Sequence, residues 1–170
     1  MDALQAILTR RSIRRFQPGR PLSAAQIDTL MQAAMAAPSA ANEQPWEFIV
    51  IDDHETLDKF QKHHPYSKML SEASCGILVC ADKNRDKLDG YLQQDCSAAT
   101  HNILLAAHAM GLGAVWLGVY PRVERVEAVR QIVGAPENIL PFAMIAIGYP
   151  AENKDPSERY EAARVHKNRW

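Results

Sequence analysis

CGILVCA, residues 75–81, is the stretch of sequence on which the expected fold rests. Its residues are apolar almost without interruption, and the run is too short to suggest a long helix. Such runs are typical of strands that are buried on both faces of a sheet. We therefore expect residues 75–81 to be a central strand with a layer of structure on each side.

Outward from this stretch, three further short runs predict strands: residues 46–51 (WEFIVI), 113–118 (GAVWLG) and 142–148 (FAMIAIG). Asp2 can cap a first helix, and Ser23 with Gln26 predicts a capping box that opens a second one. Further helices are expected over residues 54–63, 66–73, 86–110 and 124–133. This mixed order of elements predicts an α+β fold with a small central sheet flanked by helices.

The chain has 170 residues, which predicts one domain over residues 1–170. Its 47% hydrophobic and 23% charged residues are a globular composition. A net charge of −1 argues against a nucleic-acid or polybasic membrane partner. No apolar run approaches a bilayer span and the N-terminus lacks a secretory apolar core, so a cytoplasmic protein is expected. Without zinc-ligand spacing, the three cysteines are expected to be buried free thiols.

The basic residues gather at the two ends of the chain. RRSIRRF, residues 10–16, holds four arginines, and HKNRW, residues 166–170, holds two more basic residues. In a helix, arginines four residues apart would repel each other by roughly 0.2–0.5 kcal/mol per pair. In a helix or a turn, the crowded guanidinium groups suit a phosphate, although a solvated basic face and a frayed tail are the alternatives.

Two further segments have the composition of a ligand site. Residues 37–46 (APSAANEQPW) present a serine and two amides between prolines, and amides could match the pyrimidine edge of a flavin. Residues 111–121 (GLGAVWLGVYP) carry three glycines, which suggests close approach of the backbone to a flat group. An ordinary surface loop and an ordinary strand after a glycine cap are the respective alternatives.

In this order and spacing, the segments resemble the FMN-dependent nitroreductase family over nearly the whole chain. The similarity rests on RRSIRRF (10–16), PSAANEQPWEFIV (38–50), SKMLSEASCGILVCA (67–81), GLGAVWLGVYP (111–121), IAIGYP (145–150) and KNR (167–169). The resemblance implies an α+β sandwich that forms an intertwined homodimer, with FMN bound at the subunit interface.

The resemblance also implies which residues bind the cofactor. The phosphate and ribityl contacts are Arg10, Arg11, Ser12 and Arg14, and a basic pair that closes on the same phosphate is Lys167 and Arg169. The loop that often reaches the flavin from the partner subunit carries Ser39, Asn42 and Gln44, and a lysine near the pyrimidine edge is Lys68. The backbone that lies along the isoalloxazine ring belongs to Trp116, Leu117 and Gly118.

This sequence departs from larger members in two ways. Pro65 stands where they place an asparagine three residues before the lysine, which weakens the assignment of Lys68. The chain also lacks their long insertion after the central strand, so the electron acceptor does not follow by analogy.

The activity implied is transfer of hydride from NADH or NADPH through bound FMN to an oxidised small molecule, such as a nitroaromatic or a quinone, by a ping-pong mechanism. No catalytic side chain is assigned, because the flavin carries the chemistry; His63, His64, His101 and His108 are expected to be structural. The alternatives are a specialised flavin enzyme such as a reductive dehalogenase, a non-catalytic flavin-binding protein, or an interaction module with a basic arm.

Overall fold

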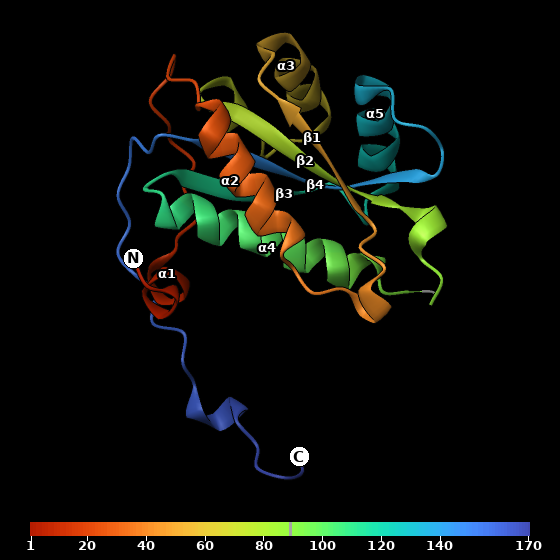
Figure 1. The fold of residues 1–170 in the computed structure, drawn as a ribbon. Coiled ribbons are helices and arrows are strands. Elements are labelled where there is room, and N and C mark those ends of the chain that lie inside the picture. The colour runs from red at the N-terminus through yellow and green to blue at the C-terminus, as the bar shows by residue number, and fades with distance from the viewer. Residues whose placement is uncertain (89) are drawn as a thin grey trace.

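The computed structural model describes every residue except Asp89. Its sheet has four antiparallel strands in the order β1-β2-β4-β3, with β1 at Trp46–Ile51, β2 at Cys75–Asp82, β3 at Gly113–Gly118 and β4 at Ile139–Gly148. Figure 1 shows the sheet at the centre of the molecule. The expectation for residues 75–81 is confirmed, because β2 is an inner strand and these residues are buried.

Five α-helices and four short 3-10 helices are seen in the described chain. The α-helices are α1 Ala3–Thr9, α2 Ala24–Met35, α3 His54–His63, α4 Leu92–Ala109 and α5 Val123–Val133; the 3-10 helices are η1 Ala40–Asn42, η2 Lys68–Ser71, η3 Lys83–Arg85 and η4 Ala162–Arg164. Helices α2 and α4 cover one face of the sheet, whereas α3 and α5 cover the other (Figure 1). The predicted α+β sandwich with a small central sheet is therefore confirmed.

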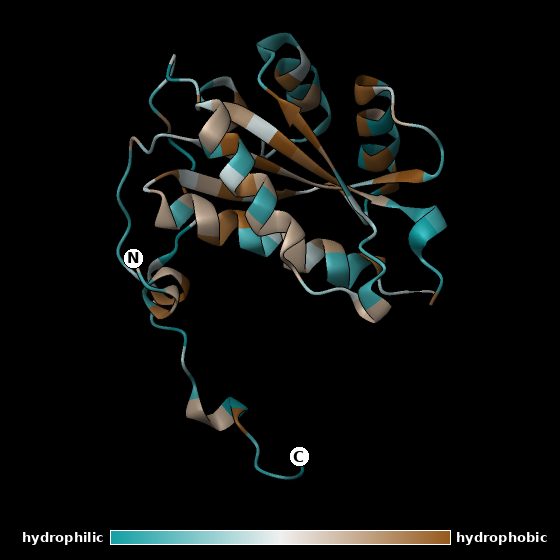
Figure 2. Cartoon of the chain, in the orientation of Figure 1, coloured by the Kyte–Doolittle hydropathy of each residue, from teal (hydrophilic) through white to brown (hydrophobic). Residues whose placement is uncertain are grey.

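The two faces of β2 explain why its sequence is apolar throughout. Ile77 and Val79 belong to the buried cluster under α2 and α4, whereas Leu78 and Cys80 belong to the cluster under α3 and α5. Successive side chains of a strand point to opposite faces, so two covered faces require apolar residues at every position. In Figure 2 the strands and the inner sides of the helices accordingly carry the hydrophobic colour.

The predicted N-terminal caps of the first two helices are confirmed, but the predicted bounds of two later helices are wrong. Asp2 caps α1, and Ser23 forms the expected capping box with Gln26. The helix expected over 86–110 begins only at Leu92, because Gly90 adopts a positive φ of 97° that a helix does not allow; position 89 of that span lies outside the described residues. The helix expected over 66–73 is only the 3-10 turn η2.

All three cysteines are free and buried, as expected. Burial is the main reason why the pKa of each thiol is raised to about 12, so these thiols stay protonated and unreactive at neutral pH. In the part of the chain that the structure describes, no helix is both long enough and apolar enough to cross a membrane.

The two ends of the chain leave the body on the same side (Figure 1). Helix α1 exposes apolar side chains, with Leu4 71% and Leu8 69% accessible. The tail after Pro150 extends away from the sheet and is largely hydrophilic (Figures 1 and 2). A helix with an exposed apolar face and an outstretched tail are features that a second subunit could cover.

Gly113 at the start of β3 provides a test of this packing. An added Cβ there would lie 2.7 Å from Ile13 Cγ2 and 2.9 Å from Ile13 Cβ, and 3.3 Å from Phe16. Gly113→Ala is therefore expected to lower the free energy of unfolding by about 1–3 kcal/mol, the usual cost of overpacking. Urea denaturation measures this, and Gly118→Ala is the matched control because the nearest atom to its Cβ would be 3.9 Å away. Equal stability of the two variants would contradict the packing.

Candidate functional site

The arginine-rich segment is neither a helix nor a free turn. Helix α1 ends at Thr9, and the following residues run in extended form between β3 and the start of the C-terminal tail. Ile13 N–H donates to the carbonyl of Ala114 in β3 at 3.0 Å, and Ala151 N–H donates to the carbonyl of Arg15 at 2.9 Å. The repulsion expected in a helix therefore does not arise, and the arginines are held beside β3 by main-chain bonds.

Neighbouring arginines in this segment lie in different hollows. Arg10 lines a hollow between α1 and the tail, together with Arg159. Arg11 lines another hollow with His108 and Lys154, and its guanidinium donates to the carbonyl of Asp155. Successive side chains of an extended chain point to opposite sides. One side of the segment thus carries Arg10 and the other carries Arg11.

Arg10 sits in a positively charged, partly buried environment. Burial, and then the charges of Arg159 and Arg11, lower its pKa, although an arginine remains protonated. The pKa values of His101 and His108 are also lowered, first by burial and then by Arg10. Among the described residues no carboxylate lies within ion-pair distance of Arg10. An anion in the hollow would relieve this unbalanced charge.

Glu152 and Lys154 hold the backbone of the segment that follows. The backbone N–H of Arg14 donates to the Glu152 carboxylate at 2.6 Å, and Lys154 Nζ donates to the carbonyl of Ser12 at 2.9 Å. The two tail residues also pair with each other at 3.0 Å. This arrangement leaves the side chain of Arg14 exposed and unpaired with any acid in the described residues.

The Glu152 contact predicts a dependence of stability on pH. The hydrogen bond from Arg14 N–H, aided by Lys154, holds the pKa of Glu152 below its ordinary value of 4.5. A lowered carboxyl pKa stabilises the fold above the unfolded pKa, and this contribution is lost as the pH falls through the folded value. Denaturation at a series of pH values should therefore show a steeper acid loss for the native chain than for Glu152→Gln. The exposed Glu72→Gln is the control, and an equal slope for all three proteins would rule out the contact.

The loop after α2 carries the three predicted polar contacts in a strained backbone. Asn42 and Gln44 have positive φ angles of 57° and 50°, and Ala41 has 45°. Ser39 Oγ accepts from Gln44 N–H at 3.0 Å, and the Gln44 amide donates to Asn42 Oδ1 at 3.1 Å. Left-handed residues other than glycine cost of order 1–3 kcal/mol each and gather at functional sites. The loop therefore brings Ser39, Asn42 and Gln44 together at an energetic cost.

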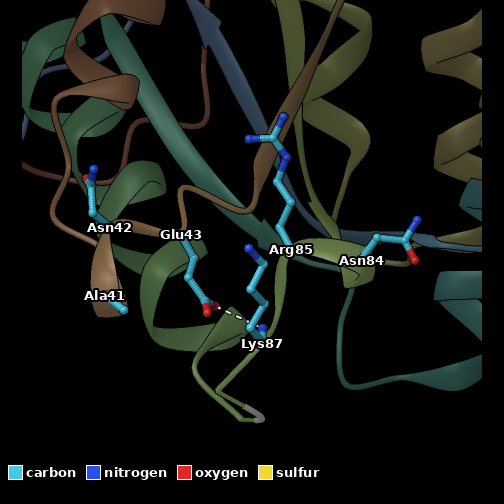
Figure 3. Close-up of a pocket in the computed structure, with 6 residues that line it drawn as sticks. All are labelled: Ala41, Asn42, Glu43, Asn84, Arg85 and Lys87. Carbon is cyan, nitrogen blue, oxygen red and sulfur yellow. Dashed lines mark hydrogen bonds between the residues drawn. The ribbon is translucent and has the colours of Figure 1, made fainter.

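Residues outside the loop hold it in this form. Asp95 in α4 is 5% exposed and accepts from Ala40 N–H at 3.1 Å, while its second carboxylate oxygen has no partner in the structure. Glu43 reaches across a hollow of about 460 Å³ to accept from the backbone N–H of Lys87 at 3.2 Å (Figure 3). Such contacts from two other parts of the chain are what a strained loop requires to persist.

The end of β3 offers an open stretch of backbone. Trp116 packs against Phe142 with ring centroids 5.9 Å apart, and Leu117 is buried under the opposite helices. At Gly118, by contrast, the nearest atom to an added Cβ would be Tyr120 O, 3.9 Å away. The missing side chain therefore leaves space at the backbone of Gly118, as close approach of a flat group would require.

The remaining predicted site residues are exposed. Lys68 is the first residue of η2, and His64, four residues earlier, contacts Gly118 at the end of β3. Lys167 and Arg169 lie on the tail, which in one chain does not fold back onto the arginine segment (Figure 1). Within one chain, residues 10–14 thus lie beside β3, and the polar residues of the loop after α2 lie together. Lys167 and Arg169 on the tail lie apart from both groups.

The sequence interpretation missed several residues that support these segments: Glu152, Lys154, Arg159, His64 in its contact with Gly118, and Arg125. Asp95 was visible as a lone acid in a helix of small residues. The others had no local signal, because their partners lie far away in the sequence.

Comparison with known proteins shows the family to which this fold belongs. The Nitroreductase family model matches residues 7–65 and 61–149. A Methanothermobacter thermautotrophicus protein, provisionally named an NADH dehydrogenase/NAD(P)H nitroreductase, is 48% identical over 170 residues, 100% of this chain and 88% of its own length. A similarly named structure from Bacteroides thetaiotaomicron has a TM-score of 0.94 at 43% identity, covering 99% of this chain and 98% of that one.

A third comparison includes a ligand. A Desulfovibrio desulfuricans structure, described as a provisional nitroreductase in complex with FMN, has a TM-score of 0.84 at 34% identity and covers 100% of this chain and 99% of that one. Over most of its length, then, the chain matches both the family's sequence pattern and the fold of proteins named for it. The chain belongs to the nitroreductase family.

Proposed function

We propose that residues 1–170 form one FMN-binding unit of a cytoplasmic homodimer that transfers reducing equivalents from NADH or NADPH to a small oxidised acceptor. The acceptor class is a nitroaromatic, a quinone or a similar compound, and the two substrates react in turn by a ping-pong mechanism. One observation carries the proposal: main-chain bonds hold the arginine segment against β3, the strand that ends at the open backbone of Gly118. The arginine segment and the open backbone of Gly118 therefore both lie along β3.

The residues present fit FMN in their chemistry. Arg10, Ser12 and Arg14 would hold the phosphate and the ribityl chain, because guanidinium groups bind phosphate oxygens through paired hydrogen bonds. The side chain of Arg11 lines the other hollow, so in the single chain it lies apart from this group. The unbalanced positive charge at Arg10 is what such a site needs. The Desulfovibrio desulfuricans structure, which is described as a complex with FMN, supports FMN as the ligand.

Other residues would hold the ring. The segment Trp116, Leu117 and Gly118 would lie along it, and the loop with Ser39, Asn42 and Gln44 would approach it from the partner subunit. Lys68 would place a positive charge near the pyrimidine edge, where it stabilises negative charge. Lys167 and Arg169 would complete the phosphate site once the tail is ordered against a partner.

When bound, FMN would supply two-electron transfer between the nicotinamide nucleotide and the acceptor. The residues of the chain bind and orient the reactants, and no side chain is assigned as an acid or a base. His64 and His108 are already engaged, His64 with Gly118 and His108 with Thr9 at 2.8 Å. These contacts support a structural role for both histidines.

The test uses the purified full-length chain. A yellow protein that is bleached anaerobically by NADH or NADPH, and regains its colour when an acceptor is added, supports the proposal. Binding of FMN without bleaching would indicate a non-catalytic flavin protein. A colourless protein whose melting temperature does not rise with added FMN would overturn the proposal. An acceptor panel that includes halogenated aromatics separates nitroreductase chemistry from reductive dehalogenation.

The homodimer has support in the surface of the single chain. A compact monomer of 19.0 kDa is expected to expose about 8,400 Å², whereas this chain exposes 10,034 Å². The excess is about twice the roughly 800 Å² that each partner buries in a standard protein interface. The exposed apolar face of α1 and the extended tail account for part of this surface.

Leu8→Lys is expected to weaken the dimer. Leu8 is 69% exposed in the single chain, so the change leaves the core intact but puts two charges into a symmetric interface. Loss of roughly 1.5–3 kcal/mol per leucine, or about 3–6 kcal/mol for the two, predicts a dissociation constant raised roughly a hundredfold to ten-thousandfold. Sedimentation measures this, with Val123→Lys, equally exposed on α5, as the control. A dimer that tolerates Leu8→Lys as well as Val123→Lys would place the interface elsewhere.

A further inference from the structure

Two side chains from two helices meet at the carbonyl of Gly118. Arg125, in the first turns of α5, donates from Nη1 to this oxygen at 3.0 Å. His64, the C-cap residue that follows α3, has its Nε2 3.0 Å from the same oxygen and 3.3 Å from Arg125 Nη1. A carbonyl oxygen has two lone pairs and can accept from both donors. This peptide is therefore held by groups 54 and 7 residues away in the sequence.

Burial and ring stacking hold His64 in the position of this contact. His64 is 4% exposed and stacks on Phe60 with ring centroids 5.6 Å apart. Burial lowers its pKa, so the ring is neutral at physiological pH and can donate through Nε2. Among the described residues, no group forms a hydrogen bond with its Nδ1. Burying an imidazole with one nitrogen unsatisfied is unfavourable, and the contact of Nε2 with the Gly118 carbonyl offsets part of this cost.

Arg125 places a positive charge at the Gly118 carbonyl that no acid in the described residues neutralises. Among the described residues no carboxylate lies within ion-pair distance of Arg125, whereas Arg130 on the same helix pairs with Glu127 at 2.6 Å. Arg125 is partly buried, so solvent screens its charge less than that of an exposed arginine. The next peptide N–H, that of Val119, donates to the carbonyl of Phe142 at 3.2 Å. The Gly118–Val119 peptide group is thus fixed from both sides.

We propose, resting on the function proposed above, that His64 and Arg125 are positioning residues for bound FMN. They fix the Gly118 peptide where the ring would lie, and Arg125 sets an uncompensated positive charge behind it. Reduction of a flavin adds negative charge to the ring, and a nearby fixed cation stabilises the more negative state. The pair therefore makes the chain bind reduced FMN more tightly than oxidised FMN and raises the reduction potential of the cofactor.

The first experiment compares two arginines of the same segment. Arg125→Gln and Arg122→Gln remove the same charge, but Arg122 is exposed at the start of α5. The reduction potential of bound FMN is measured at fixed pH for each purified holoprotein. Arg125→Gln is expected to lower the preference for reduced FMN about tenfold, which equals about 30 mV for a two-electron couple. Arg122→Gln and the charge-retaining Arg125→Lys should stay within about twofold of the native protein.

The second experiment needs no cofactor. In the apoprotein, His64→Phe keeps the stacking on Phe60 but loses the donor to Gly118, so amide hydrogen exchange at Val119 should become at least about tenfold faster. His64→Gln retains a donor and should exchange at a rate closer to the native one.

The outcomes separate this inference from the proposed function. Failure of the native chain to bind FMN would overturn the proposed function. An unchanged rate of Val119 amide exchange in His64→Phe would overturn the positioning role of His64. If the reduction potential of bound FMN is the same in Arg125→Gln as in Arg122→Gln, the electrostatic role of Arg125 is wrong, even if FMN binds well. If Arg125→Gln does not fold, Arg125→Met and His64→Phe are measured in its place, and a native potential in either would overturn the proposal.

Discussion

Arg14→Ala is expected to raise the dissociation constant of FMN by about tenfold to a hundredfold. The side chain of Arg14 is exposed on a backbone held by Glu152, and no acid in the described residues neutralises it. A hydrogen bond to a charged group contributes roughly 1.5–3 kcal/mol, which sets this range. Fluorescence titration of the apoprotein with FMN measures the change.

Arg15→Ala is the matched control for Arg14→Ala. Arg15 is the next residue and equally exposed, and its carbonyl accepts from Ala151 N–H whatever its side chain. In an extended segment its side chain points to the other side. FMN affinity should therefore change less than about threefold in Arg15→Ala. If both variants bind FMN equally well, the phosphate site does not involve this segment.

Gly118→Val is the second change with a large expected effect. An added Cβ at Gly118 would lie 3.9 Å from Tyr120 O, its nearest neighbour, and valine suits a strand. The fold should therefore tolerate the change. A ring lying along residues 116–118 would meet the new side chain, and overpacking of about 1–3 kcal/mol predicts FMN binding weakened by roughly tenfold to a hundredfold.

The graded variant Gly118→Ala makes this test stricter. It should weaken FMN binding less than Gly118→Val, while urea denaturation should give both variants stabilities close to that of the native chain. Native FMN affinity in Gly118→Val would show that the ring does not lie against this backbone. Loss of stability in parallel with affinity would mean instead that Gly118 is needed for the fold.

Much of the fold followed from short-range patterns in the sequence. The apolar run at 75–81 identified the inner strand, because burial on both faces allows no alternation of polar residues. The capping box at Ser23 marked the start of α2 correctly, since that interaction spans only three residues. The start of α4 was misplaced because helical spacing continues upstream of Gly90, whose positive φ breaks the helix.

The candidate site was foreseen less completely than the fold. The arginine segment, the loop after α2 and the end of β3 were recognised from composition and from their order in the chain. Whether the arginines are helical could not be decided locally, because the bonds that extend them come from Ala114 and from the tail. Asp95, which holds the strained loop through Ala40, lies 55 residues from its partner.

The sequence by itself determined the sheet strands, most helices, the family and the concentration of positive charge at both ends of the chain. These properties depend on residue type and on spacing within a few positions. Only the tertiary structure decided that Arg10 and Arg11 face different hollows, that Glu152 holds the backbone of Arg14, and that His64 and Arg125 meet at Gly118. The physical reason is that such contacts join groups that become neighbours only when helices and strands pack, and no local pattern encodes that packing.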